Sequence, residues 1–265
     1  MTVRLAATEY GPEEETGLPP VAVLHGLFGS GRNWASIAQR LAAHRAVIAF
    51  DLRNHGGSAW AGGMQYGEMA EDVLAMLQER GLRRAALLGH SMGGKAAMAA
   101  ALRDSDMIER LIVVDIAPVS YPPHHLGHVR AMRALDLSAI KRRGEADGLL
   151  AVAVPDAAER GFLLQNLVFE DGNARWRLNL EAIEREMSVL AGFPPLPDGA
   201  VYRGPALFLG GSRSDYLLAE HEPVILRRFP SARIERIDNA GHWVHSEQPA
   251  RFLQLVEPFV AGGVQ

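Results

Sequence analysis

The chain has 265 residues, of which 48% are hydrophobic and 22% are charged, and its formal net charge is −4. These values are ordinary for a globular protein with a sizeable core, and the negative charge argues against a nucleic-acid surface. The chain contains no cysteine, which excludes disulfides, thiolate metal sites and a cysteine nucleophile.

No apolar run approaches the ~18 residues of a membrane helix. The N-terminus also lacks the long apolar segment of a signal peptide. We therefore expect a cytoplasmic protein that binds neither nucleic acid nor membranes. The composition says nothing about its oligomeric state.

Short apolar runs alternate with helical patterns through the first half of the chain. The runs predict strands at residues 3–8, 20–24, 46–50, 84–88 and 111–114, with helices at 34–41, 69–77 and 94–102 between them. Continuous apolar runs are typical of strands that are buried on both faces of a parallel sheet. The alternation predicts an α/β fold with a mostly parallel central sheet flanked by helices.

The alternation stops between residues 120 and 193, where no buried strand is visible. Apolar residues there have helical spacing, in one group at Phe162, Leu163, Leu167 and Val168 and in another at Leu180, Ile183, Met187 and Leu190. The segment is too long for a loop, so we predict a helical cap (120–193) inserted in a core formed by 1–119 and 194–265. Proline-rich residues 193–197 mark the return to the core, whose last elements are strands at 205–209 and 232–237 and helices at 217–229 and 252–259.

The sequence Gly89-His-Ser-Met-Gly93 joins a predicted strand to a predicted helix. A serine at the apex of such a turn is the arrangement of a G-x-S-x-G nucleophile elbow. The turn strains the serine backbone, and side chains two positions away would clash with the strand or the helix, which explains the glycines. We therefore predict that Ser91 is the catalytic nucleophile.

A serine hydroxyl needs a general base at neutral pH. Of the ten histidines, His242 follows the last predicted strand and precedes the last helix, as expected for the base on this kind of sheet. His245 is the alternative base. His90, inside the turn, is predicted to point away from the catalytic face and to pack, and His25 to brace its own loop; His55 is left without a role.

An aspartate must orient the imidazole and stabilise its protonated form. Asp115 ends the strand after the elbow, whereas Asp215 follows the next strand, where hydrolases of this architecture most often carry the acid. Each also has an ordinary alternative: Asp115 could cap a helix, and Asp215 could pair with Arg213 on the surface. The residues alone leave the choice between the two aspartates open.

Acyl transfer also needs donors for the developing oxyanion. The backbone N–H of Met92, next to the nucleophile, is one candidate, and that of Leu27, after an earlier strand, is the other. Each such donor is typically worth ~3 kcal/mol in the transition state. We expect no metal ion and no other cofactor.

Four stretches together resemble the YbfF-type serine esterases of the α/β-hydrolase superfamily, namely residues 89–98, 51–56, 114–118 and 241–245. The likeness covers essentially the whole chain and is weakest in the insertion. It implies a serine esterase with a helical cap that acts on small acyl esters or thioesters. It also implies that Asp115 is the acid and that Ser214 lies near the histidine. Asp215, beside Ser214, is the reserve acid.

We therefore predict hydrolysis of small carboxylic esters through an acyl-enzyme on Ser91. A serine at the elbow argues against haloalkane dehalogenases and epoxide hydrolases, which have an aspartate there. A thioesterase or C–C bond hydrolase with the same triad is the nearest alternative, and a non-catalytic ligand-binding member of the fold is a more distant one. The acyl group is not readable, because the insertion that would shape its pocket carries the fewest signals.

Overall fold

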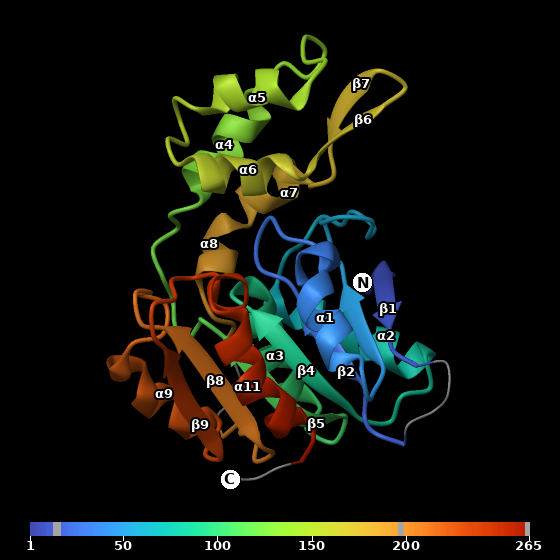
Figure 1. The fold of residues 1–265 in the computed structure, drawn as a ribbon, viewed down its shortest axis with the longest axis vertical. Coiled ribbons are helices and arrows are strands. Elements are labelled where there is room, and N and C mark those ends of the chain that lie inside the picture. Colours follow the sequence, from blue (N-terminus) through green and yellow to red (C-terminus); the bar gives the residue numbers. More distant parts are fainter. Residues whose placement is uncertain (13–16, 196–198, 263–265) are drawn as a thin grey trace.

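The computed structural model describes residues 1–12, 17–195 and 199–262. Its central sheet is formed by Ala7–Tyr10 (β1), Val21–Leu24 (β2), Val47–Phe50 (β3), Ala85–His90 (β4), Ile108–Val114 (β5), Ala206–Gly211 (β8) and Ala232–Ile237 (β9). The strands lie in the order β1-β3-β2-β4-β5-β8-β9. Figure 1 shows β9 and β8 at one side of the sheet and β1 at the other. β1 pairs antiparallel with β3, and all other neighbours are parallel. The predicted α/β class with a mostly parallel sheet is confirmed.

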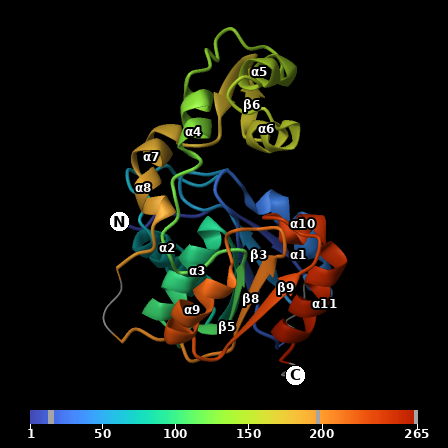
Figure 2. The ribbon, with the colours of Figure 1, turned by 90° about the vertical axis from the view of Figure 1, so that its left-hand side faces the viewer.

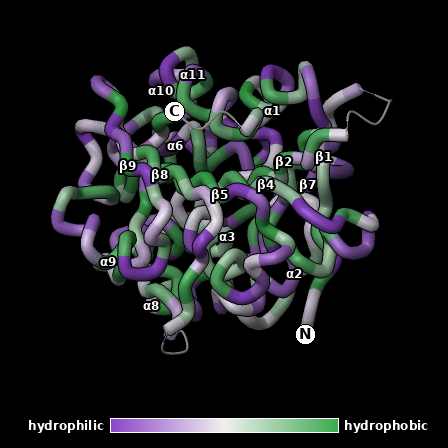
Figure 3. The backbone as a smooth tube through the Cα atoms, turned by 90° about the horizontal axis from the view of Figure 1, so that it is seen from below, coloured by the Kyte–Doolittle hydropathy of each residue, from purple (hydrophilic) through white to green (hydrophobic). Residues whose placement is uncertain are grey.

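Helices cover both faces of this sheet (Figure 3). One face packs against Ala35–Leu41 (α1) and Pro249–Val260 (α11), and the other against Tyr66–Glu79 (α2), Met92–Arg103 (α3) and Glu222–Arg228 (α9). Three short helices lie in the connections: Gly31–Trp34 (η1), Ala219–His221 (η2) and Val244–Glu247 (α10). Every residue of β2, β3, β4 and β8 is buried, which explains why these strands are continuous apolar runs.

The edge strand β1 differs from its prediction, because it begins at Ala7 instead of Val3. The backbone N–H of Val3 donates a hydrogen bond to Asp72 Oδ1 of α2 over 2.8 Å, so the chain approaches a helix before it joins the sheet. The inner strands lie close to their predicted positions. Their carboxyl ends meet at one edge of the sheet, and the loops that follow β2, β4, β5, β8 and β9 gather there.

The chain between β5 and β8 rises above this edge of the sheet (Figure 2). Its elements are Leu126–Arg133 (α4), Arg143–Leu150 (α5), Ala157–Leu164 (α6), Leu167–Glu170 (β6), Asn173–Trp176 (β7), Leu180–Arg185 (α7) and Met187–Ala191 (α8). Of the proline-rich stretch predicted to mark the return to the core, residues 196 and 197 lie outside the described part of the chain.

Two predictions for this insertion are wrong in detail. Leu167 and Val168 belong to the β6–β7 hairpin instead of continuing the helix from Phe162. The hairpin turns at Asp171 and Gly172, which both have positive φ, of 51° and 77°, as a two-residue Asp-Gly turn requires. The later apolar group is divided between two helices, α7 and α8, which meet at Glu186.

Hydrogen bonds join the insertion to the core at several points. Asn166 Nδ2 donates to the carbonyl of Phe28 over 2.8 Å, and the hydroxyl of Tyr66 donates to the carbonyl of Leu190 over 2.6 Å. Lys95 Nζ, on α3, donates to the carbonyls that end α8. The buried apolar side chains of the insertion also join the cluster that covers one face of the sheet. Within the described residues, no helix is long and apolar enough to cross a membrane.

Candidate active site

The turn between β4 and α3 has the geometry of a nucleophile elbow. Ser91 has φ 53° and ψ −117°, a conformation that costs a non-glycine residue of order 1–3 kcal/mol. A Cβ on Gly89 would lie 2.2 Å from the carbonyl oxygen of Gly93, and one on Gly93 would lie 2.4 Å from that of Leu24. Both glycines are therefore required by backbone contacts. The backbone N–H of Ser91 donates to the carbonyl of Val114 over 3.0 Å, which fixes the elbow to β5.

The ring of His242 lies against a buried carboxylate. Its Nδ1 is 2.7 Å from Oδ2 of Asp115, which is fully shielded from solvent. Two further donors hold the same carboxylate: the backbone N–H of Gly211 contacts Oδ1 over 3.0 Å, and the hydroxyl of Ser214 bonds to Oδ2. Three donors offset the cost of burying this charged carboxylate. The carboxylate in turn holds the Nδ1 proton of the imidazole in place.

The structure separates the two candidate acids. Asp215 is exposed, whereas its neighbour Ser214 is buried and donates to Asp115. The alternative role of Asp215, a pair with Arg213, is not seen among the described ion pairs, where Arg213 Nη2 lies 3.0 Å from Glu247 Oε2 instead. Asp115 does not cap a helix either: its φ of 52° turns the chain where β5 ends and aims the carboxylate at the loops after β8 and β9.

The two predicted oxyanion donors belong to residues that adjoin Ser91, Met92 in the chain and Leu27 in space. Met92 is the first residue of α3, so its N–H has no acceptor within the helix. Leu27 lies in the turn after β2, and among the described residues its N–H takes no part in the hydrogen bonds of that turn. Leu27 and Ser91 line the same hollow.

Two histidines brace the turn that carries Leu27. His25 Nδ1 donates to the carbonyl of Gly26 over 2.8 Å, while its Nε2 accepts from the N–H of Leu52 over 2.9 Å. His55, to which the sequence assigned no role, makes the same two kinds of contact from the neighbouring loop: its Nδ1 donates to the carbonyl of Arg53 over 2.9 Å, and its Nε2 accepts from the N–H of Phe28 over 3.2 Å. Burial lowers the pKa of both rings, that of His55 to about 3, so both remain neutral and able to accept. The bracing role predicted for His25 fits this arrangement.

His90 packs on His242, and His245 packs on His90. The predicted packing role of His90 agrees with its contacts, but its ring does not point away from the site: its centroid is 4.6 Å from that of His242, and Nε2 donates to the His242 carbonyl over 2.9 Å. His245 stacks on Trp34 with 3.9 Å between ring centroids, and burial lowers its pKa to about 3. A ring so enclosed is a poor candidate for the alternative base.

Two small hollows, each of about 50 Å³, meet at Ser91. His242, Phe162 and Trp243 line the first, and Met92, Ile116 and Tyr121 line the second. Two larger hollows, each of about 550 Å³, lie elsewhere, and neither Ser91 nor His242 lines them. The candidate site therefore lies at the two small hollows.

Three groups around these hollows were missed by sequence reasoning. Tyr216 covers the His242 ring with 4.3 Å between centroids, and burial raises its pKa. Lys95, four residues after the nucleophile, is buried beside Tyr121, and burial lowers its pKa to about 7. His125, from the insertion, lines both hollows, and burial lowers its pKa to about 4. The sequence offered two signals for these groups, the position of Lys95 in the elbow helix and the three-residue spacing of His125 and His128.

Comparisons with known proteins identify the family of the chain. The family model described as "Alpha/beta hydrolase family" matches residues 21–255. The sn-1-specific diacylglycerol lipase ABHD11 of Mus musculus is 41% identical over 252 residues, which cover 92% of this chain and 81% of the relative. Esterase YbfF of Escherichia coli K12 is 34% identical over 248 residues, covering 91% of this chain and 92% of the relative, which confirms the predicted resemblance.

A solved structure described as a marine microorganism esterase superposes with a TM-score of 0.92 at 36% sequence identity. The match covers 97% of this chain and all of the other. Family model, relatives and structure agree along nearly the full length of the chain. The chain therefore belongs to the alpha/beta hydrolase family.

Proposed function

We propose that this protein is a serine esterase that hydrolyses carboxylic esters through an acyl-enzyme on Ser91. The observation that carries the proposal is the 2.7 Å contact between His242 Nδ1 and Asp115 Oδ2, beside a strained elbow serine that lines the same hollow as His242. Relatives named esterases and lipases support the reaction class.

In the proposed mechanism, His242 Nε2 accepts the hydroxyl proton of Ser91 while Oγ attacks the ester carbonyl. The negative charge moves to the carbonyl oxygen, where the N–H groups of Met92 and Leu27 stabilise it. The imidazolium then gives its proton to the departing alcohol, which leaves the acyl group on Ser91. Water, deprotonated by the same ring, then attacks the acyl carbonyl, and the imidazolium returns the proton to Ser91 Oγ as the bond to the acyl group breaks and the acid leaves. Asp115 keeps the Nδ1 proton in place throughout and stabilises the imidazolium.

We also propose that the insertion at residues 120–193 is a cap over this cleft. Its residues His125, Phe162 and Leu163 line the hollow that contains Ser91. Phe162 also contacts Trp243, next to the catalytic histidine, with 5.8 Å between ring centroids. The cap therefore decides which acyl and alcohol groups can enter. The volume of about 50 Å³ on each side of Ser91 favours short chains.

A diacylglycerol is the second candidate substrate, because a named diacylglycerol lipase shares 41% identity over nearly the whole chain. A thioesterase activity with the same triad is the third. One panel separates them: 4-nitrophenyl esters with acyl chains from acetyl to palmitoyl, matched acyl thioesters, and a diacylglycerol in mixed micelles. We expect the highest kcat/KM for short-chain oxygen esters. No turnover of any panel member above that of Ser91→Ala would contradict the proposed function.

A further inference from the structure

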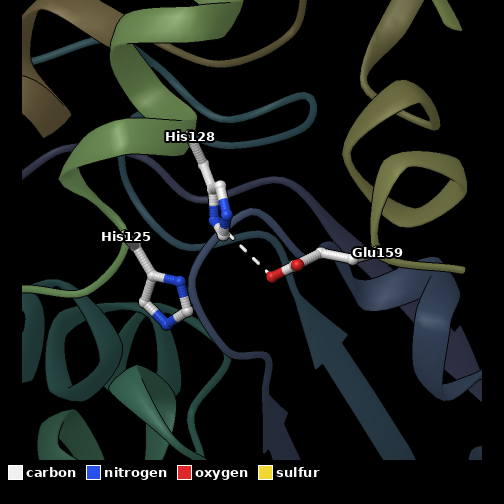
Figure 4. A group of neighbouring side chains, drawn as sticks. All are labelled: His125, His128 and Glu159. Carbon is white, nitrogen blue, oxygen red and sulfur yellow. Dashed lines mark ion pairs between the residues drawn. The ribbon is translucent and has the colours of Figure 1, made fainter. Parts of the chain in front are cut away.

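Two histidines and a glutamate from different parts of the insertion meet beside the cleft (Figure 4). His125 precedes the first turn of α4 and His128 lies in that turn, three residues later, so both lie on one face of the helix. Glu159 comes from the first turn of α6. One ligand atom from each residue lies within 4.8 Å of the others, and His128 Nδ1 is 3.5 Å from Glu159 Oε1.

Among the described residues, the Nδ1 atom of each histidine lacks a hydrogen-bond partner, and the 3.5 Å approach of His128 Nδ1 to Glu159 Oε1 is an ion-pair contact and not a hydrogen bond. Nδ1 of His125 and Nδ1 of His128 are both shielded from solvent, and neither makes a hydrogen bond within the described part of the chain. Buried polar side-chain atoms normally have a partner, and leaving one without costs free energy. We therefore expect these two nitrogens and the neighbouring carboxylate to share a bound ligand.

The donor set determines what that group is. Two imidazole nitrogens and one carboxylate oxygen suit Zn²⁺ and its neighbours Ni²⁺ and Cu²⁺, whereas Mg²⁺ and Ca²⁺ prefer oxygen ligands alone. In a tetrahedral zinc site with bonds of about 2.0–2.1 Å, the ligand atoms are ~3.3 Å apart. The His128–Glu159 pair, at 3.5 Å, already has this separation. The His125 ring needs only a small movement to complete three ligands, which leaves a fourth position open.

We propose that His125, His128 and Glu159 bind a zinc-class divalent ion that inhibits the enzyme. His125 lines both hollows at Ser91, and Glu159 lines the one that contains His242. An ion held by these side chains, with water as its fourth ligand, occupies the approach to Ser91. It also ties α4 to α6, so that the two parts of the insertion above the cleft can no longer move apart for substrate.

The binding part of this proposal stands on the cluster alone, whereas the inhibition part rests on the proposed ester hydrolysis. Binding is therefore measured first, by calorimetric titration of ZnCl₂ into protein that has been freed of metal with EDTA and that carries Ser91→Ala. We expect one Zn²⁺ per chain. His128→Gln, in the same background, should weaken binding at least about tenfold, because a ligand is lost. His124→Gln, at an exposed neighbour outside the cluster, is the matched control and should bind like the parent.

Inhibition is then measured on metal-free protein with Ser91 intact, relative to the activity of each variant without Zn²⁺. The concentration for half inhibition should rise at least about tenfold in His128→Gln and stay unchanged in His124→Gln. Equal Zn²⁺ affinity with and without His128 would overturn the site. Binding through His128 without any change in ester turnover would overturn the inhibition. If Zn²⁺ binds through His128 but the protein without metal hydrolyses no ester, the site is supported and the proposed function is overturned.

Discussion

Replacing the buried aspartate of the proposed triad should disable the base without removing it. In Asp115→Asn, the remaining carbonyl oxygen can still accept from the N–H of Gly211, which now contacts Oδ1 over 3.0 Å. The new NH₂ group then replaces Oδ2, which in the wild-type protein accepts from His242 and Ser214. An NH₂ group can only donate, so it favours the imidazole tautomer whose proton is on Nε2. That tautomer cannot accept the proton of Ser91.

The expected loss is large because tautomer and charge change together. A wrong tautomer in a serine triad costs up to ~10⁴-fold in kcat, or about 5.4 kcal/mol of transition-state stabilisation. Ser214→Ala removes one of three donors to the carboxylate and leaves its charge, so we expect a loss of about tenfold. Asp215→Asn changes an exposed side chain and should also cost less than about tenfold.

The assay is kcat and KM on 4-nitrophenyl acetate for the three single variants and for the double variant of both aspartates. Circular dichroism and urea unfolding verify that each variant is folded. Asp115→Asn that keeps more than a tenth of the wild-type kcat would refute the assignment. A loss of a thousandfold or more in Asp215→Asn would mean that the exposed aspartate, and not the buried one, orients the histidine.

Three further predictions concern the scaffold of the site. Burial lowers the pKa of His55 and of His245 to about 3. The stability that the neutral rings provide is therefore complete above pH 6.5 and falls by about 2 kcal/mol for each ring at pH 5. Urea unfolding free energies that are equal at pH 7 and pH 5 would contradict this. Gly89→Ala places a Cβ 2.2 Å from a backbone oxygen and should abolish activity or folding, whereas Gly67→Ala, with open space in a helix, should raise the melting temperature slightly. Lys95→Met leaves two carbonyls at the end of α8 without their donor and should lower the free energy of unfolding by about 2–3 kcal/mol; an unchanged urea midpoint would refute it.

The core strands could be predicted because the burial of each strand determines the pattern of its own residues. A strand buried on both faces must be apolar throughout, and the predicted strand at residues 20–24 nearly coincides with β2, every residue of which is buried. The elbow was readable because two glycines are needed where backbones approach closely. The first strand was placed too early, because an edge strand has only one neighbour to fix where it begins.

The insertion was read less well because its signals are ambiguous. Apolar residues at Phe162, Leu163, Leu167 and Val168 fit one helical face, and they also fit a helix followed by a strand. Asp171-Gly172 was the available signal, since this dipeptide between apolar residues is typical of a two-residue hairpin. The helical spacing of the surrounding apolar residues obscures this turn signal.

The acid could not be chosen from the sequence, because Asp115 and Asp215 both follow strands that end at one edge of the sheet. The choice depends on the backbone turn at Asp115 and on the buried Ser214, and neither is visible in the residue order. The His125–His128 spacing was visible, but Glu159 is separated from it by a helix and two loops, so only the folded insertion brings the three together.

The central claim is a covalent acyl-enzyme on Ser91, and mass spectrometry of the protein tests it most directly. The protein is mixed with 4-nitrophenyl acetate, quenched with acid within the first turnovers and digested, and the mass of each peptide is compared with that of the untreated protein. We expect one added acetyl group, on the peptide and residue of Ser91, and none in Ser91→Ala. Steady ester turnover with no adduct on Ser91, or an adduct that persists in Ser91→Ala, would contradict it.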